Sequence, residues 1–426
     1  MKFLREFETE SAYNAEKDNL DLPNVSHVVE SQNNYFHPIL PRDYSREYLT
    51  YEVLEDGLLG LAFRKEGDAP DIVVSYSIND GEWSTLPIID WEDTSSCIEV
   101  TEGDVIRFKG NNNAFNYFDD ETEDNSKGQI LLYDSTLENP IEINVYGNIM
   151  SVIYGDNFIG QTSFPNGSRD NLDGFFNWTG VIDASNLILP ATALTEFCYA
   201  YMFDSCSSLV TAPSELPALS LANNCYECMF NGCSSLVNAP ELPATTLAEC
   251  CYYLMFVDCT SLVDAPELPA TTLANSCYAK MFTGCTSLVT APELPATTLA
   301  NSCYESMFYG CSSLINAPEL PATTLVDGCY AFMFHNCTSL LTAPELPATT
   351  FPNSFSFGPY EEMFAWCTSL NYVKCLISDY SAGPTHTWNW LQGVSANGTF
   401  VKASDMEWWT TGVSGIPNGW TVVDAS

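Results

Sequence analysis

Cysteine is the residue type with the widest chemistry in this sequence. The chain holds 17 cysteines, and most recur about every 26 residues. Such thiols can form disulfides between neighbouring repeats, bind a metal, or pack as small apolar side chains. Only Cys225 and Cys228 have CxxC spacing, and no second pair matches them. The spacing therefore favours packing, with the other two roles left open. Two series follow the period: Cys198, Cys225, Cys251, Cys277, Cys303, Cys329, and Cys206, Cys233, Cys259, Cys285, Cys311, Cys337, Cys367.

The acid–base residues form no recognisable catalytic motif. The histidines His27, His37, His335 and His386 are scattered along the chain, and GxSxG, HExxH and phosphate-loop motifs are missing from the sequence. Cysteines in repeated core positions are poor candidates for a single activated nucleophile. We therefore expect no enzyme activity. A glycosidase-type carboxylate pair within residues 47–148 stays open as an alternative.

An acidic run lies in the segment NNNAFNYFDDETEDNSKG, residues 111–128, which we expect to be a long loop. Calcium prefers several oxygen ligands, so this run is a weak candidate for a calcium site, although EF-hand spacing is lacking. We otherwise expect no cofactor and no metal. The candidate ligands are Asp119, Asp120, Glu121, Glu123 and Asp124.

The charge of the chain excludes several partners. The net charge is −41, and Lys280 is the sole basic residue between Asp170 and Val373. So acidic a surface repels nucleic-acid phosphates and anionic membranes. No apolar run reaches the ~18 residues of a membrane span, and the N-terminus lacks the apolar core of a signal peptide.

A repeat dominates the C-terminal half. APELPATTL begins at Ala239, Ala265, Ala291 and Ala317, with CYxxMFxxC between the copies. A fixed period of this length is typical of stacked-repeat architectures. The apolar spacing in residues 303–311 predicts a short helix, which a strand-like stretch and a Pro-bounded corner follow. One repeat cannot bury its own apolar face, so stacking must provide the core.

The repeats resemble a known class. The segments MFTGCTSL, MFYGCSSL and MFHNCTSL are similar to the BspA-type leucine-rich surface proteins, and the APELPATTLANSCY spacer resembles a variant found in gut phages of Bacteroidales. The resemblance covers roughly residues 175–426. It implies a right-handed leucine-rich-repeat-type α/β solenoid with terminal caps.

The expected fold is multidomain and β-rich. Alternating, β-branched segments predict an Ig-like β-sandwich, with Asn79-Asp80-Gly81 as a hairpin turn. The expected parts are a small N-terminal anchor module (1–46), the β-sandwich (47–148), a solenoid N-cap (149–174), the repeats (175–375) and a Trp-rich C-terminal cap (376–426).

The N-terminal segment FETESAYNAEKDNLDLPNVSHVVESQNNYFHP resembles the opening of virion proteins of Bacteroides phages, including crAss-like ones. The resemblance implies an anchoring module that docks to other virion proteins. Within this segment, LPNVSHVVESQNNYFHP by itself predicts a β-hairpin around residues 31–34. The expected docking residues are Phe7, Tyr13, Pro23, Val25 and Tyr35.

Comparison of the repeats with one another indicates a candidate binding face. Most positions are fixed, but those flanking the Met-Phe pair vary. Exposed aromatic side chains there could stack on sugars, although neutral drift would produce the same variation. The candidate ligand-binding residues are Tyr201, Tyr253, Lys280, Tyr309, Phe332 and His335.

These observations lead to one expected function. The chain is expected to be a phage virion surface protein, either a head fibre, a capsid decoration or a tail-fibre component, assembled in the host cytoplasm. It would form homo-oligomers on the particle and bind a host or mucosal glycan or protein. The alternatives are a bacterial BspA-like surface adhesin and, third, a carbohydrate-active enzyme.

Overall fold

The computed structural model describes residues 27–30, 36–39, 42–66, 71–89, 94–112, 115–118, 125–165, 169–353, 356–379, 384–406 and 409–426. The protein is β-rich, with 25% strand and 5% helix arranged around several sheets. The strands are β1 (His27–Glu30), β2 (Phe36–Ile39), β3 (Leu49–Val53), β4 (Gly57–Glu66), β5 (Val74–Ile78), β6 (Ser84–Thr85), β7 (Ile98–Val100), β8 (Val105–Gly110), β9 (Tyr117–Phe118), β10 (Asn125–Tyr133), β11 (Glu142–Asn148), β12 (Gly180–Ile188), β13 (Thr342–Leu346), β14 (Tyr372–Cys375), β15 (Thr399–Lys402) and β16 (Thr421–Asp424). The helices are short: η2 (Tyr44–Arg46), η3 (Thr94–Ser96), α2 (Ser151–Tyr154), η4 (Gly155–Asn157) and η6 (Pro384–Thr387).

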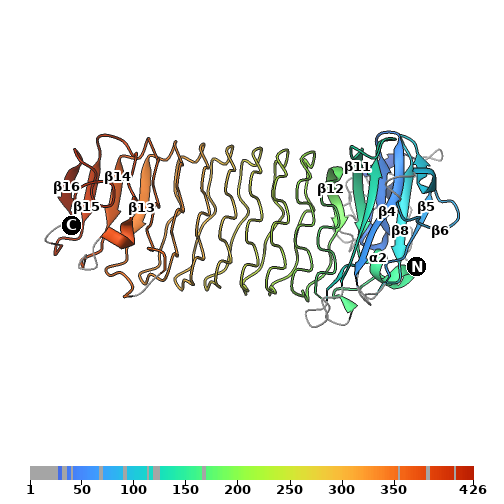
Figure 1. The fold of residues 1–426 in the computed structure, drawn as a ribbon, viewed down its shortest axis with the longest axis horizontal. Coiled ribbons are helices and arrows are strands. Elements are labelled where there is room, and N and C mark those ends of the chain that lie inside the picture. Colours follow the sequence, from blue (N-terminus) through green and yellow to red (C-terminus); the bar gives the residue numbers. More distant parts are fainter. Residues whose placement is uncertain are drawn as a thin grey trace.

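Two sheets form the N-terminal part of the molecule, which we call the sheet body (Figure 1). One has the order β7-β4-β10-β9 and the other β12-β11-β3-β8-β5-β6. Alternate residues of β8 are buried, as expected of a strand with one face on a core. Leu61 of β4 and Phe108 of β8 belong to the same hydrophobic cluster. Two sheets that share a core agree with the alternating pattern of residues 47–148.

The predicted hairpin turn is confirmed. Asn79 and Asp80 have φ of 51° and 61°, which a two-residue type I′ turn requires at both central positions. Gly81 N–H donates to the Ile78 carbonyl at 2.9 Å, and β5 pairs antiparallel with β6.

The last residues of the expected N-terminal module, 42–46, contact the two sheets. The Asn148 side-chain amide donates to the Ser45 carbonyl at 3.0 Å. The Arg42 guanidinium lies 4.8 Å from the Tyr146 ring centroid, and Tyr44 packs edge-on against the same ring. Residues 42–46 therefore belong to the sheet body. The expected hairpin before them is confirmed as the antiparallel pair β1 and β2.

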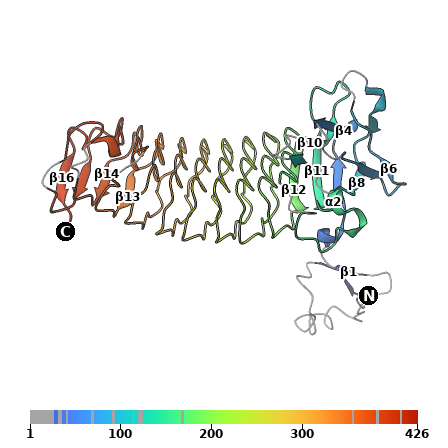
Figure 2. The same ribbon diagram turned by 60° about the horizontal axis from the view of Figure 1, so that its bottom comes forward.

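The repeat region continues the larger sheet directly. Strand β12, which lies in the first repeat, pairs in parallel with β11. Beyond β12, parallel bridges join Asp183, Thr211, Asn238, Asp264, Thr290, Asn316 and Thr342 in succession. Figures 1 and 2 show the resulting row of similar chain turns, side by side along the long axis, ending in β13 to β16.

The first repeat begins earlier than expected. The N–H of Asp170 donates to the Glu196 carbonyl, and the N–H of Leu172 donates to the Cys198 carbonyl. Residues 170–174 are thus part of the first repeat. Helix α2, which lies in the expected N-cap (149–174), contacts the larger sheet: the Ser151 hydroxyl donates to the Phe108 carbonyl of β8 at 2.9 Å.

The short helix predicted for each repeat is wrong. Residues 276–285 form a series of turns, with positive φ at Ser276, Lys280 and Gly284. Every second N–H donates within the turn to the third residue before it. The alternate N–H groups donate to the next repeat, as from Phe282 to the Met307 carbonyl at 2.9 Å. An α-helix bonds only within itself, so this conformation gains inter-repeat hydrogen bonds that a helix lacks. We call this ten-residue stretch of each repeat the turn segment.

Two aromatic columns fill the core of the repeat stack. In the first, Phe256, Phe282 and Phe308 stack at 5.6 and 5.7 Å between ring centroids. In the second, Tyr252 and Tyr278 stack at 5.7 Å. The tyrosine column was not anticipated from the sequence. The members are Phe176, Phe203, Phe230, Phe256, Phe282, Phe308, Phe334, Phe364 and Tyr199, Tyr226, Tyr252, Tyr278, Tyr304, Tyr330, Tyr360.

The tryptophans of the C-terminal part extend the tyrosine column. Trp390 stacks on Tyr360 at 6.1 Å, and Trp409 stacks on Trp390 at 5.7 Å. The Trp390 indole N–H donates to the Gly415 carbonyl at 2.9 Å, so a fully buried polar atom is satisfied. The four parallel strands β13-β14-β15-β16 form the sheet at this end of the molecule.

The expected loop at residues 111–128 is partly wrong, because β9 and the start of β10 lie within it. The proposed calcium ligands at residues 119–124 lie outside the described residues. So do the expected docking residues Phe7, Tyr13, Pro23, Val25 and Tyr35.

Candidate functional site

The turn segments place the variable residues of successive repeats on one side of the stack. Lys280 N–H donates to the Glu305 carbonyl at 2.7 Å, and Tyr201 N–H donates to the Glu227 carbonyl at 2.8 Å. These backbone bonds fix neighbouring side chains in register. We call this side the variable face. It comprises Tyr201, Glu227, Tyr253, Lys280, Glu305, Tyr309, Phe332, His335 and Glu362.

A first group on the variable face centres on Lys280. The Lys280 ammonium lies 3.4 Å from the Tyr253 hydroxyl and 5.6 Å from the ring centroid of the same tyrosine. It also forms an ion pair with Glu305 at 4.0 Å. The Tyr253 ring is therefore held in one orientation by a cation–π contact. Its side chain is half-buried.

A second group lies two repeats further along. The Tyr309 and His335 rings stack at 4.5 Å with an interplanar angle of 8°, and Phe332 lies 6.3 Å from His335. His335 Nδ1 is 3.2 Å from a Glu362 carboxylate oxygen. Burial lowers the pKa of His335, and Glu362 opposes this shift. Tyr309 is 38% exposed, so one aromatic surface of this group faces solvent.

Tyr201 stands apart from these two groups. Its hydroxyl donates to the Glu227 carboxylate at 3.0 Å. Of the six residues that the sequence indicated, the structure therefore brings Tyr253 together with Lys280, and Tyr309 and Phe332 together with His335. The variable face can stack on planar or ring-shaped ligands and offers hydrogen bonds beside each aromatic ring.

The cysteines are placed for packing rather than for nucleophilic chemistry. All 17 are free thiols, and all but Cys97 and Cys250 are buried. Burial raises the pKa of Cys206 to about 11 and that of Cys375 to about 12. Thiols with such pKa values are almost entirely protonated at neutral pH and are weak nucleophiles. Within the described residues, no group of three or more His, Cys, Asp or Glu side chains could hold a metal ion.

The APEL glutamates form an exposed row along another side of the stack. A parallel bridge joins Glu241 to Glu215 of the preceding repeat. The exposed glutamates are Glu241, Glu267, Glu293, Glu319 and Glu345. At the C-terminal end, Lys374 forms an ion pair with Glu345 at 2.8 Å.

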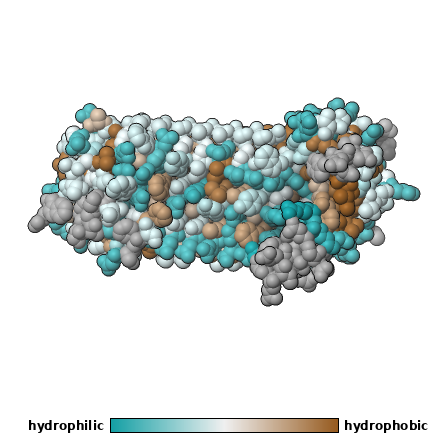
Figure 3. Space-filling model, in the orientation of Figure 1, coloured by the Kyte–Doolittle hydropathy of each residue, from teal (hydrophilic) through white to brown (hydrophobic). Residues whose placement is uncertain are grey.

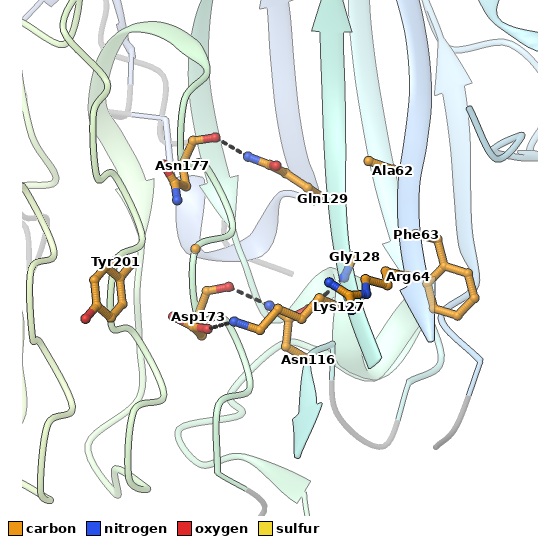
Figure 4. A pocket seen from close by; sticks show the side chains of 11 residues that line it. Ala62, Phe63, Arg64, Asn116, Lys127, Gly128, Gln129, Asp173, Asn177 and Tyr201 are labelled. Atoms are coloured by element: carbon orange, nitrogen blue, oxygen red, sulfur yellow. Dashed lines mark hydrogen bonds and ion pairs between the residues drawn. The ribbon is translucent and has the colours of Figure 1, made fainter. Parts of the chain in front are cut away.

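A pocket of about 530 Å³, which we call the junction pocket, lies where the smaller sheet meets the first turn segments (Figure 4). Strand β4 contributes Ala62 and Arg64, and β10 contributes Lys127 and Gln129. Facing them are residues of the first two turn segments. These are Asp173, Gly174, Asn177 and Tyr201.

Three side chains of the pocket form an ion pair or hydrogen bonds between the smaller sheet and the first repeat. The Lys127 ammonium pairs with the Asp173 carboxylate, and the Gln129 amide donates to the Asn177 carbonyl. The Asn116 amide donates to the Asp173 carbonyl at 2.5 Å. Burial raises the pKa of Asp173, and the neighbouring Lys127 opposes this shift. Of these residues, the sequence had indicated only Tyr201. The available signal was the presence of Arg64 and Lys127 in two β-type segments of a chain with only 14 basic residues, and the structure places these two residues opposite each other on β4 and β10.

No protein-family model, curated protein or solved structure matches this chain. Among the described residues, no helix has both the length and the apolar character that crossing a membrane requires.

Proposed function

We propose that the protein is a binding protein whose repeats form a right-handed leucine-rich-type solenoid. The parallel bridges, the stacked aromatic columns and the hydrogen bonds from each turn segment to the next support this architecture. Each repeat contributes one layer, so the molecule presents long, rigid faces.

The variable face carries the functional argument. The Met-Phe pair recurs in every repeat after the first, where Phe175-Phe176 takes its place, while residues on the variable face differ from one repeat to the next. Tyr253 and Tyr309 are held by Lys280 and His335 before any ligand arrives. Because rigid aromatic side chains lose little entropy on binding, such a face suits a glycan or a protein partner.

The function that we propose is that of a phage virion surface protein, anchored through its N-terminal segment and directing the variable face toward a host or mucosal surface. The resemblance of residues 7–38 to the opening of phage virion proteins and the net charge of −41, which disfavours nucleic acid, support this proposal. A bacterial surface adhesin of the same repeat class is the second candidate. It shares the binding face and differs in the particle or cell that carries the protein.

Binding to a panel of host and mucosal glycans, and to host cells, tests the role of the variable face. We expect Tyr253→Ala and Tyr309→Ala to weaken binding at least tenfold, because each removes an aromatic contact surface. Tyr372→Ala is the matched control, since Tyr372 is also half-buried but lies in β14. Equal binding by all three variants would contradict the proposal.

A further inference from the structure

One exposed position of the repeats is aliphatic in six consecutive layers. It comes directly after a buried leucine, as Val289 follows Leu288. Backbone hydrogen bonds, such as that from Val289 N–H to the Val263 carbonyl at 3.1 Å, and parallel bridges at the next residue hold neighbouring members in register. The side chains thus form one continuous row, which we call the aliphatic stripe. Its members, which are 39–48% exposed, are Val210, Val237, Val263, Val289, Ile315 and Leu341.

The rows on both sides of the stripe carry almost no charge. Before it comes a row of serine and threonine, and after it a row of threonine and asparagine with one aspartate, Asp264. On the face of the repeats that Figure 3 shows, by contrast, apolar side chains occur in separate areas between hydrophilic ones. The stripe is therefore a surface on which two copies of a chain with net charge −41 can meet while few like charges oppose each other.

The size of this surface also fits an interface. The six side chains leave roughly 400 Å² of apolar surface exposed, and patches of about 300–600 Å² are often functional. Two copies in contact along the stripe and its flanking rows would bury on the order of 1,200 Å² in total, at the lower end of the range for specific interfaces. An area of this size suits a reversible dimer.

We propose that the aliphatic stripe is the interface of a parallel homodimer of this chain. The APEL glutamates, such as Glu293, come four residues after the stripe and hence lie on one side of it. A two-fold axis along the stripe places the two glutamate rows on opposite sides of the interface, whereas the antiparallel arrangement places them next to each other. Like-charge repulsion thus favours the parallel dimer, with both sheet bodies at the same end.

This inference goes beyond the proposed function, because it requires neither a particle nor a glycan. The stripe shares no residue with the variable face. Loss of dimerisation and loss of glycan binding are therefore separate outcomes.

Analytical ultracentrifugation of the full-length chain tests the dimer. We expect a monomer–dimer equilibrium with a Kd on the order of 10 µM. Sodium chloride should strengthen it, because salt screens the repulsion between two acidic chains. Val237→Asp and Ile315→Asp should each weaken dimerisation at least tenfold, since each places a charge in an apolar contact. Thr297→Asp is the matched control, because Thr297 is exposed but lies eight residues beyond the stripe.

Thermal unfolding at a concentration below this Kd checks that each variant retains the fold. Val237→Thr keeps the shape of valine at an exposed position, so it should weaken the dimer and leave the unfolding midpoint unchanged. A monomer at concentrations well above the expected Kd would overturn the proposal and leave the stripe to a different partner. A dimer that salt weakens, or one that Ile315→Asp leaves unchanged, would also overturn it.

Cross-linking with a short bis-maleimide determines the orientation. In the parallel dimer, Val210→Cys should be joined to the same residue of a second copy, and so should Leu341→Cys. The unaltered chain gives the background from its partly exposed thiols, Cys97 and Cys250. Cross-links that form only in a mixture of the two variants would show an antiparallel dimer and contradict the proposed arrangement.

Discussion

At the scale of single residues, cysteine has a specific structural role in each repeat. The Cys311 thiol donates to the Phe282 carbonyl of the preceding repeat at 3.1 Å, and Cys285 N–H donates to the same oxygen. Both lone pairs of a buried carbonyl are thus used. In the first repeat, Thr179 takes the cysteine position, and its hydroxyl donates to the Phe176 carbonyl of its own repeat at 2.6 Å. A small side chain with one hydrogen-bond donor therefore occupies this position throughout the stack.

Burial of these thiols predicts a loss of stability at alkaline pH. Cys206 has its pKa raised from 9.0 to about 11, so the unfolded chain loses the thiol proton before the native chain does. The corresponding stability is fully present below about pH 9 and is lost as pH rises through 11. Urea unfolding at pH 7, 8.5 and 10 should show a steep decline only above pH 9.

Cys206→Ala provides the matched comparison. The variant should be less stable than the unaltered chain at pH 7. The difference should narrow above pH 9 by up to about 1.4 kcal/mol per pH unit, because the variant lacks this titration. A difference that does not change with pH would contradict the assignment.

At the scale of elements, the turn segment is stable only beside another copy. Half of its N–H groups donate to the next repeat, as from Tyr278 to the Cys303 carbonyl. The phenylalanine column adds ring stacking between the same neighbours. The first repeat is no exception, because Phe176 contacts Phe203 on one side at 5.0 Å and Tyr51 of β3 on the other at 6.0 Å. The sheet body thus covers the end of the stack.

Substitution in the phenylalanine column tests this arrangement. We expect Phe282→Ala and Phe176→Ala to lower the free energy of unfolding by similar amounts, about 3–5 kcal/mol each, since both rings are fully buried with neighbours on two sides. Val289→Ala, which alters a side chain that is 40% exposed, should change it by less than about 0.5 kcal/mol. A much smaller loss for Phe176→Ala in urea melts would show that the sheets do not cover the first repeat.

At the scale of the whole molecule, one parallel ladder joins the sheet body to the C-terminal strands. It runs from β11 through β12 and the single bridges of each repeat to β16. The N-terminal segment joins this body at Arg42 and Tyr44. We therefore assign the proposed anchor to the residues before Arg42.

Deletion of residues 1–41 tests the anchor. The truncated protein should fold with an unchanged unfolding midpoint, because residues 42–46 keep their contacts with Tyr146 and Asn148. It should fail to join virions, whereas residues 1–41 fused to an unrelated soluble domain should join them. Normal copy number of the truncated protein on particles, measured by quantitative immunoblotting, would rule out this anchor. Deletion of residues 1–46 should in addition destabilise the sheets.

The sequence by itself determined the stacking of repeats and much of the core. The 26-residue period places Phe282 and Cys285 at apolar positions that recur along the repeats, and a single repeat can bury such side chains only by stacking on its neighbours. Asn79-Asp80-Gly81 identified its hairpin because the residues that tolerate positive φ are few.

Only the tertiary structure decided the conformation of the turn segment and the position of the junction pocket. The spacing of Cys303 and Met307 fits a helix, but the decisive hydrogen-bond acceptors lie 25 residues away in the next repeat, where local periodicity carries no information. Likewise Arg64, Lys127 and Asp173 meet through strand pairing and the docking of the sheet on the first repeat. Such long-range contacts depend on the packing of the whole chain, so no short stretch of sequence encodes them.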